Sequence, residues 1–223
     1  MKPIKKRYIE HFGQKAFLSS VIVGFLLLAA SLFINFFAGT YATAHASNSV
    51  NDIILSNIPV FDVDGIFIYG PLFLWLFVSL ICLYQPKKIP FVLKSIALFV
   101  FIRSIFITLT HIGPFPDETL FSSNPARWFN KFAFGGDLFF SAHTGLPFLM
   151  SLVFWDNKTL RYIFIVTAAF FGAIVLLGHF HYSIDVFAAF FITYAIFHMA
   201  EFIFEKDRLV SKEGLPAVQI IIK

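Results

Sequence analysis

Charge and cysteine are what this 223-residue sequence has least of. Only 13% of the residues are charged and 58% are hydrophobic, whereas an ordinary soluble domain carries about 25% charged residues. Together with a mean hydropathy of +0.80, this deficit predicts an all-α, polytopic membrane protein. The single cysteine, Cys82, lies in an apolar run. It excludes both an intrachain disulfide and a cysteine-rich metal cluster.

Apolar runs recur six times, each close to the roughly 20 residues that a helix needs to cross the hydrocarbon core. They lie at about 16–38, 66–84, 91–112, 138–155, 160–177 and 182–204. We therefore expect six transmembrane helices. The expected organisation is a basic cytosolic segment at 1–16, a six-helix membrane catalytic domain at 17–205 and a cytosolic tail at 206–223.

The first apolar run must be weighed against a signal peptide, because Ala44-His45-Ala46 resembles a small-residue cleavage site. Signal h-regions run only about 7–15 residues, and this run is longer. Its length favours an uncleaved helix.

Basic residues are distributed unequally between the two sides of the predicted bundle. Five fall in 1–16, three in 85–94, two in 156–161 and four in 206–223, whereas the opposite loops contain only Arg127 and Lys131. Because cytoplasmic loops are enriched in Lys and Arg, both termini are predicted to face the cytosol. This placement also explains the net charge of +4 without a nucleic-acid partner.

Two polar motifs interrupt this apolar pattern, and both are predicted at the non-cytosolic mouth of a helix. The first runs from Gly135 to Gly145 and contains Asp137, Ser141 and His143; the second, from His179 to Val186, contains His181 and Asp185. Ionisable groups at membrane depth are costly and mark functional sites. Taking the fourth helix to begin near residue 138, we expect His143 about 7–8 Å below its start.

The residue types in these motifs suit phosphoryl chemistry. His181 and Asp185 are four residues apart, so they can share one helix face, and the carboxylate could orient the imidazole as a nucleophile. His143 could protonate a leaving alkoxide and later deprotonate the acceptor. Asp137 and Ser141 have the same spacing and would orient His143 or hold a phosphate oxygen.

Arg103 and His179 leave alternatives open. Arg103 lies in an otherwise uncharged stretch of the third run, and its guanidinium fits either a substrate phosphate or an internal salt bridge to Asp137 or Asp185. His179 competes with His181 for the role of nucleophile.

The pattern Gly-Asp-x-x-x-Ser-x-His-Thr at 136–144, followed by His-Tyr-Ser-x-Asp-Val at 181–186, resembles the sphingomyelin synthase family, a branch of the type-2 phosphatidic acid phosphatase superfamily. The resemblance implies a catalytic triad of His143, His181 and Asp185 and a phosphohistidine intermediate, with neither metal nor cofactor. It also implies a role in sphingolipid metabolism. Two positions depart from the family pattern, with Gly135 in place of Cys and Ala142 in place of Gly.

The expected activity is therefore transfer of a phosphocholine or phosphoethanolamine head group from a glycerophospholipid donor to a lipid alcohol such as ceramide or diacylglycerol, or to water. The site would lie on the periplasmic side of a bacterial inner membrane, or on the lumenal or extracellular side in a eukaryote. The alternatives are a lipid phosphate phosphatase, a transporter or proton relay, and an inactive homologue. Against the phosphatase, the sequence lacks a Lys-x6-Arg-Pro element and has Val175 where that branch carries an arginine.

Overall fold

Eight α-helices make up the computed structural model, which describes residues 3–116 and 137–215. Two of them are short polar helices at one end of the bundle, α1 (Ile4–Phe12) and α8 (Glu205–Glu213). The other six are apolar: α2 (Lys15–Ala44), α3 (Asp64–Tyr84), α4 (Ile89–Leu109), α5 (Ala142–Val153), α6 (Lys158–Leu177) and α7 (Ser183–Ile203). Two 3-10 turns, Leu55–Asn57 and Pro86–Lys88, complete the described elements. The prediction of an all-α fold is confirmed, and five of the six predicted membrane helices are long enough to span a bilayer, with α5 a shorter apolar helix.

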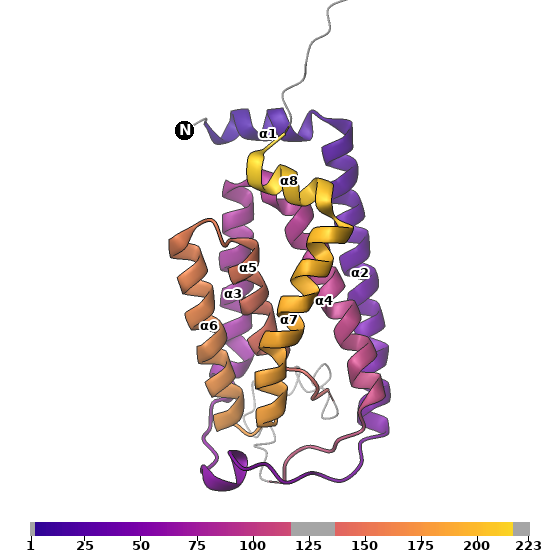
Figure 1. Ribbon diagram of the computed structural model, residues 1–223, viewed down its shortest axis with the longest axis vertical. Coiled ribbons are helices and arrows are strands. Elements are labelled where there is room, and N and C mark those ends of the chain that lie inside the picture. The colour runs from indigo at the N-terminus through magenta and orange to yellow at the C-terminus, as the bar shows by residue number, and fades with distance from the viewer. Residues whose placement is uncertain (1–2, 117–136, 216–223) are drawn as a thin grey trace, which may run out of the picture.

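Five of the apolar helices are long enough to cross a membrane, and the sixth, α5, has only 12 residues. Figure 1 shows α1 and α8 together at one end of the bundle, while the loops that follow α2 and α4 lie at the other end. The expected N-terminal segment and tail therefore contain a helix each.

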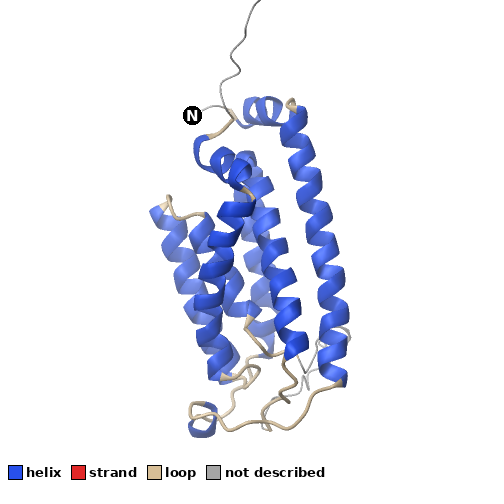
Figure 2. Cartoon of the chain, turned by 45° about the vertical axis from the view of Figure 1, so that its right-hand side comes forward, coloured by secondary structure: helices blue, strands red, loops and turns tan. Residues whose placement is uncertain are grey.

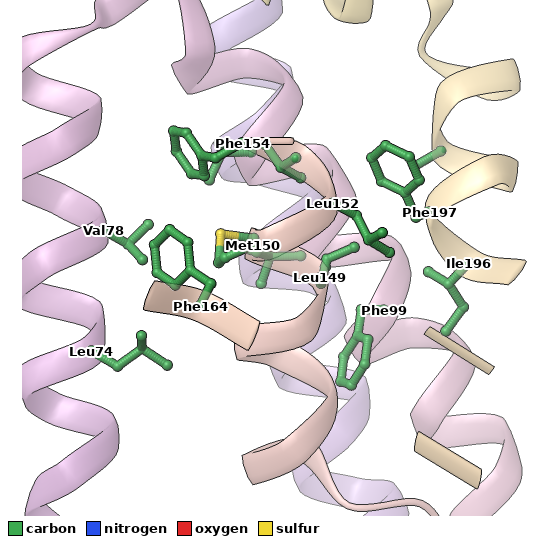
Figure 3. Close-up of a cluster of buried hydrophobic side chains, with 14 of the residues drawn as sticks. Leu74, Val78, Phe99, Leu149, Met150, Leu152, Phe154, Phe164, Ile196 and Phe197 are labelled. Carbon is green, nitrogen blue, oxygen red and sulfur yellow. The ribbon is translucent and has the colours of Figure 1, made fainter. Parts of the chain in front are cut away.

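The short helix α5 occupies the centre of the bundle. It packs against α4, α6 and α7, and Leu149, Met150 and Val153 are fully buried. Figure 3 shows Leu149 and Met150 among side chains from the neighbouring helices, including Phe99 of α4 and Ile196 of α7. Figure 2 gives a second view of the surrounding long helices.

Glycine at 145 allows the close approach of α5 to two neighbours. A Cβ atom at this position would lie 2.7 Å from the ring of Phe99 and 2.8 Å from the hydroxyl of Thr193. Small residues are typical of such helix contacts within membranes. The position of α5, and with it that of His143, is thus fixed by packing on two sides.

The beginning of α5 differs from the prediction. The fourth run was expected to be helical from about residue 138, but residues 137–141 are not helical and α5 begins at Ala142. Since α5 and α6 share the turn at 154–157, their lengths of 12 and 20 residues leave the start of α5 about 12 Å short of the far end of α6. His143 is therefore the second residue of a recessed helix, not the sixth residue of a full-length one.

Candidate active site

The non-helical segment 137–141 is the centre of the candidate site. Backbone polar groups at membrane depth must find partners inside the protein, and non-helical backbone is tolerated there only where protein buries it or water reaches it. Here the Ser141 N–H donates to the carbonyl of Asp185 at 3.1 Å. The carbonyls of Asp137, Leu138 and Phe140 each accept from a charged or aromatic side chain. The two sequence motifs are thus joined directly by hydrogen bonds.

Arg103 of α4 is the main support of this segment. Its Nε donates to the Phe140 carbonyl at 2.7 Å and an Nη atom donates to the Asp137 carbonyl at 3.1 Å. The other Nη atom lies 2.5 Å from Oδ1 of Asp137 in an ion pair. The Arg103 side chain is only 5% exposed. Of the two roles left open by the sequence, the structure contains the internal salt bridge to Asp137.

His181 is oriented by a backbone carbonyl. Its Nδ1 lies 2.8 Å from the carbonyl oxygen of Leu138, and the ring is almost completely buried. Because a carbonyl oxygen only accepts hydrogen bonds, Nδ1 carries the proton in this contact. The other ring nitrogen, Nε2, is then the one with a free lone pair when the imidazole is neutral.

Asp185 lies at the third position of α7, and its side chain is completely buried. Its Oδ2 accepts a hydrogen bond from the N–H of Tyr182 at 2.9 Å and lies 3.5 Å from Nδ1 of His181. The contact expected between His181 and Asp185 therefore exists, although His181 precedes α7 and does not share a helix face with Asp185. The other oxygen, Oδ1, has no hydrogen-bond partner among the described residues.

His143 approaches the same region from α5. Its Nε2 lies 3.2 Å from the carbonyl of Phe67, and its ring stacks on the Phe67 ring at a centroid distance of 4.1 Å. Phe67 also contacts the ring of Phe180, the neighbour of His181, at 4.3 Å. One aromatic side chain of α3 thus touches both halves of the site.

Helices α5, α6 and α7 converge next to these histidines. A Cβ atom added at Gly172 would lie 3.0 Å from Val186, which follows Asp185, and 3.5 Å from the hydroxyl of Thr144, which follows His143. Beside His143, a small apolar pocket is lined by side chains from three helices: Pro71, Leu74, Trp75, Ala142, Leu146, Pro147 and Phe171.

Ser141 is the residue that begins α5. Its side chain caps α5 by accepting from the Thr144 N–H at 3.4 Å, and the Thr144 hydroxyl lies 3.3 Å away. Asp137 and Ser141 were expected to face the same helix mouth, and both lie in the non-helical segment 137–141 before α5. Asp137 pairs with Arg103 and Ser141 caps α5, so the two side chains have different partners.

His179 lies in the turn that closes the end of α6. It ends α6 with φ of +56°, its N–H donates to Leu176, and the next N–H, that of Phe180, donates to Val175. This is the hydrogen-bond pattern of a helix end closed by a residue in the left-handed conformation. Its ring is buried against Phe115, and both ring nitrogens lack partners among the described residues.

Asp52 and Tyr182 were not identified as site residues from the sequence. The Asp52 carboxylate accepts from the N–H of Ser183, the first residue of α7, at 2.7 Å. The Tyr182 hydroxyl donates to the carbonyl of Gly113 at 2.8 Å. An aspartate in a polar loop and a tyrosine at a membrane interface are both common, so no sequence pattern distinguishes these two.

Part of the first motif and most of the loop before it, including Arg127, Trp128 and Lys131, lie outside the described residues. Within 3–116 and 137–215, no group of three or more His, Cys, Asp and Glu side chains is placed to hold a metal ion. A reaction without metal or cofactor stays a prediction.

These features define a helical integral membrane protein with two histidines and a buried carboxylate gathered at one end of its bundle. Residues 135–202, which include both motifs and helices α5 and α6, match the family model described as PAP2 superfamily C-terminal. The match supports the predicted relationship to the type-2 phosphatidic acid phosphatase superfamily, and with it phosphatase or phosphotransferase chemistry on lipid phosphates. It does not single out the sphingomyelin synthase branch. No curated protein and no solved structure matches the chain.

Proposed function

We propose that this protein is a lipid head-group phosphotransferase that moves a phospho-alcohol from a glycerophospholipid to a lipid alcohol or to water. One observation carries the proposal. The Leu138 carbonyl holds Nδ1–H of His181, so Nε2 is the free nucleophile, and His143 approaches from another helix.

In the first step, the lone pair on Nε2 of His181 attacks the donor phosphorus and the bond from phosphorus to the glycerol oxygen breaks. A protonated His143 gives its proton to that oxygen, and diacylglycerol leaves. Since Nε2 of His143 faces the Phe67 carbonyl, the proton is transferred from Nδ1. The product is a phosphohistidine that carries the head group.

In the second step, neutral His143 takes the proton of the acceptor hydroxyl. The acceptor oxygen attacks phosphorus, and the bond from phosphorus to Nε2 breaks. Asp185 stabilises the positive charge that His181 carries as a phosphohistidine, because its buried carboxylate lies 3.5 Å from Nδ1. Oδ1 of Asp185, which has no hydrogen-bond partner among the described residues, adds to the stabilisation of this positive charge.

The charge of the site favours a phosphodiester over a phosphomonoester. Arg103 is the only cation among the described residues of the site besides the histidines, and it is already paired with Asp137. Asp185 adds a further negative charge. A diester carries one negative charge and a monoester carries nearly two, so repulsion from the site is smaller for the diester. We propose phosphate binding by the two remaining N–H groups of Arg103, with Ser141 and Asp137 as the supporting residues.

The proposed orientation places the site on the non-cytosolic face. Helices α1 and α8, which contain basic residues, lie at one end of the bundle, and the site lies at the other (Figure 1). Because positively charged segments remain on the cytoplasmic side, the donor and acceptor lipids would come from the outer leaflet.

The test uses the purified full-length protein in liposomes that contain labelled phosphatidylcholine, phosphatidylethanolamine or phosphatidic acid, with and without ceramide, and mass spectrometry of the products. We expect diacylglycerol and a transferred head group from the first two lipids. His181→Ala should abolish the reaction, whereas the matched variant His179→Ala should retain it. Retention in His181→Ala with loss in His179→Ala would move the nucleophile by two residues.

The phosphatase is the second candidate, because the matching family model belongs to the PAP2 superfamily. Release of inorganic phosphate from phosphatidic acid, with no product from the two diesters, would establish that activity and overturn the transferase. If none of the three lipids is cleaved, both enzymatic proposals fail.

A further inference from the structure

The start of α7 has an acceptor that comes from a distant loop. Asp52 lies between α2 and α3 and is only 6% exposed. Its Oδ2 accepts from the Ser183 N–H at 2.7 Å, and its Oδ1 accepts from the N–H groups of Ile54 and Leu55 at 2.8 and 3.1 Å. Both oxygens of one carboxylate are therefore used, one toward its own loop and one toward the helix.

This contact has a direct electrostatic consequence for α7. The first N–H groups of a helix have no partner within it, and a carboxylate there is favoured by the partial positive charge of the helix end. Oδ2 of Asp185 accepts a hydrogen bond from the N–H of Tyr182. The N–H of Ser183 therefore needs an acceptor from outside α7. Asp52 fills that role.

Further contacts connect the same loop to the residues around His181. The Val50 N–H donates to the Tyr182 hydroxyl at 3.2 Å, and that hydroxyl donates to the Gly113 carbonyl at 2.8 Å. The Phe61 N–H donates to the Leu177 carbonyl at 2.9 Å. The loop thus holds the chain on both sides of His181, and the contact at Ser183 is the one made by a charged group.

We propose that Asp52 is a positioning residue for the nucleophile: by capping α7 it holds the backbone at 182–183 and so aims Nε2 of His181 at the substrate phosphorus. The inference rests on the proposed function. Asp52 touches neither substrate nor the reacting atoms, so its removal should slow the formation of phosphohistidine while lipid binding is unchanged.

The experiment is a burst measurement on full-length protein in liposomes with labelled phosphatidylcholine, comparing Asp52→Ala, Asp52→Asn and the control Asp62→Ala. Asp62 is an exposed aspartate of the same loop, and its Oδ1 accepts a hydrogen bond from the N–H of Asp64 at 3.3 Å. Burst amplitude reports the fraction of active protein, and the burst rate constant reports how well the nucleophile is aimed.

For Asp52→Ala we expect the burst rate constant to fall about fivefold to tenfold, as for the loss of a helix cap, with amplitude and KM unchanged. Asp52→Asn should recover most of the rate, because its amide oxygen still accepts from Ser183. Asp62→Ala should stay within about twofold of the wild type.

An unchanged rate constant in Asp52→Ala, or a loss confined to the amplitude, would overturn the inference, since either result describes a merely structural residue. A wild-type protein that releases no head group would instead refute the proposed function. In that case amide hydrogen exchange still tests the placement: faster exchange at Ser183 in Asp52→Ala, with Asp62→Ala unchanged, supports the cap, and equal exchange overturns it.

Discussion

Arg103 offers the sharpest test of how the site is built, because its contacts with the segment 137–141 and the phosphate binding proposed for its two remaining N–H groups predict different results, depending on which contributes more to the rate. If Arg103 acts by holding the segment 137–141, its effect must be shared with Asp137, to which it is bonded at 2.5 Å. If it acts by binding the substrate phosphate, Asp137 competes with the substrate for it. A double-mutant cycle of Arg103→Met and Asp137→Asn distinguishes the two roles.

The magnitudes follow from the contacts. Arg103→Met removes the ion pair and the hydrogen bonds to the carbonyls of Asp137 and Phe140, and breaking a buried pair costs about 3–5 kcal/mol. Asp137→Asn removes one charge-assisted hydrogen bond, a cost of about 1.5–3 kcal/mol. If this cost falls entirely on the transition state, kcat/KM of Asp137→Asn decreases roughly 10-fold to 150-fold.

The assay is kcat/KM for labelled phosphatidylcholine in liposomes, measured for the wild type, both single variants and the double variant. We expect the double variant to be no worse than Arg103→Met alone, which gives a coupling energy of about 1.5–3 kcal/mol. Strict additivity, or a kcat/KM for Asp137→Asn at or above the wild-type value, would refute the positioning role and assign Arg103 to the phosphate.

Two further predictions concern pH and packing. Burial raises the pKa of Asp52, but the hydrogen bonds from Ser183, Leu55 and Ile54 outweigh this and hold it below its ordinary value of 3.8; Asp52 therefore contributes stability above about pH 4 that is lost as the pH falls through its folded-state pKa. In thermal unfolding in detergent between pH 7 and pH 3, the stability advantage of the wild type over Asp52→Asn should be largest at pH 7 and should shrink below about pH 4; a constant difference would contradict this. Gly145→Ala should cost about 1–3 kcal/mol by overpacking, whereas the helical control Gly65→Ala, whose Cβ would meet no atom within 4 Å, should be neutral or slightly stabilising; equal unfolding temperatures would contradict the packing argument.

The long helices were predictable because a span of about 20 apolar residues is a strong signal that packing does not override. The predicted and observed bounds of α3, α4, α6 and α7 differ by at most three residues. Helix α2 continues six residues past its predicted end at 38, to Ala44. The other exception is α5, where residues 138–141 are apolar enough to be predicted as helix. Their conformation depends on partners from α4 and α7, and such tertiary hydrogen bonds leave no periodic pattern in the sequence.

The site residues also divide into those that the sequence pattern predicts and those that depend on tertiary contacts. His143, His181 and Asp185 could be proposed from the sequence because ionisable residues in apolar runs are rare. The carbonyl of Leu138 could not, since every residue has a carbonyl and only the fold selects which one meets the His181 ring. The role of Asp52 could not be predicted for a similar reason, because its hydrogen-bond partner is a backbone N–H 131 positions away.

The recessed start of α5 has a consequence for how a lipid would be used. If the far end of α6 lies at the membrane surface, a shortfall of about 12 Å relative to α6 would place the His143 imidazole below the level at which head groups meet water, close to the depth of the glycerol linkage. A donor would then be cut while its acyl tails stay in their leaflet, with little extraction from the membrane. Bilayer thickness itself would influence turnover, since a thicker or thinner leaflet shifts the scissile bond relative to the ring.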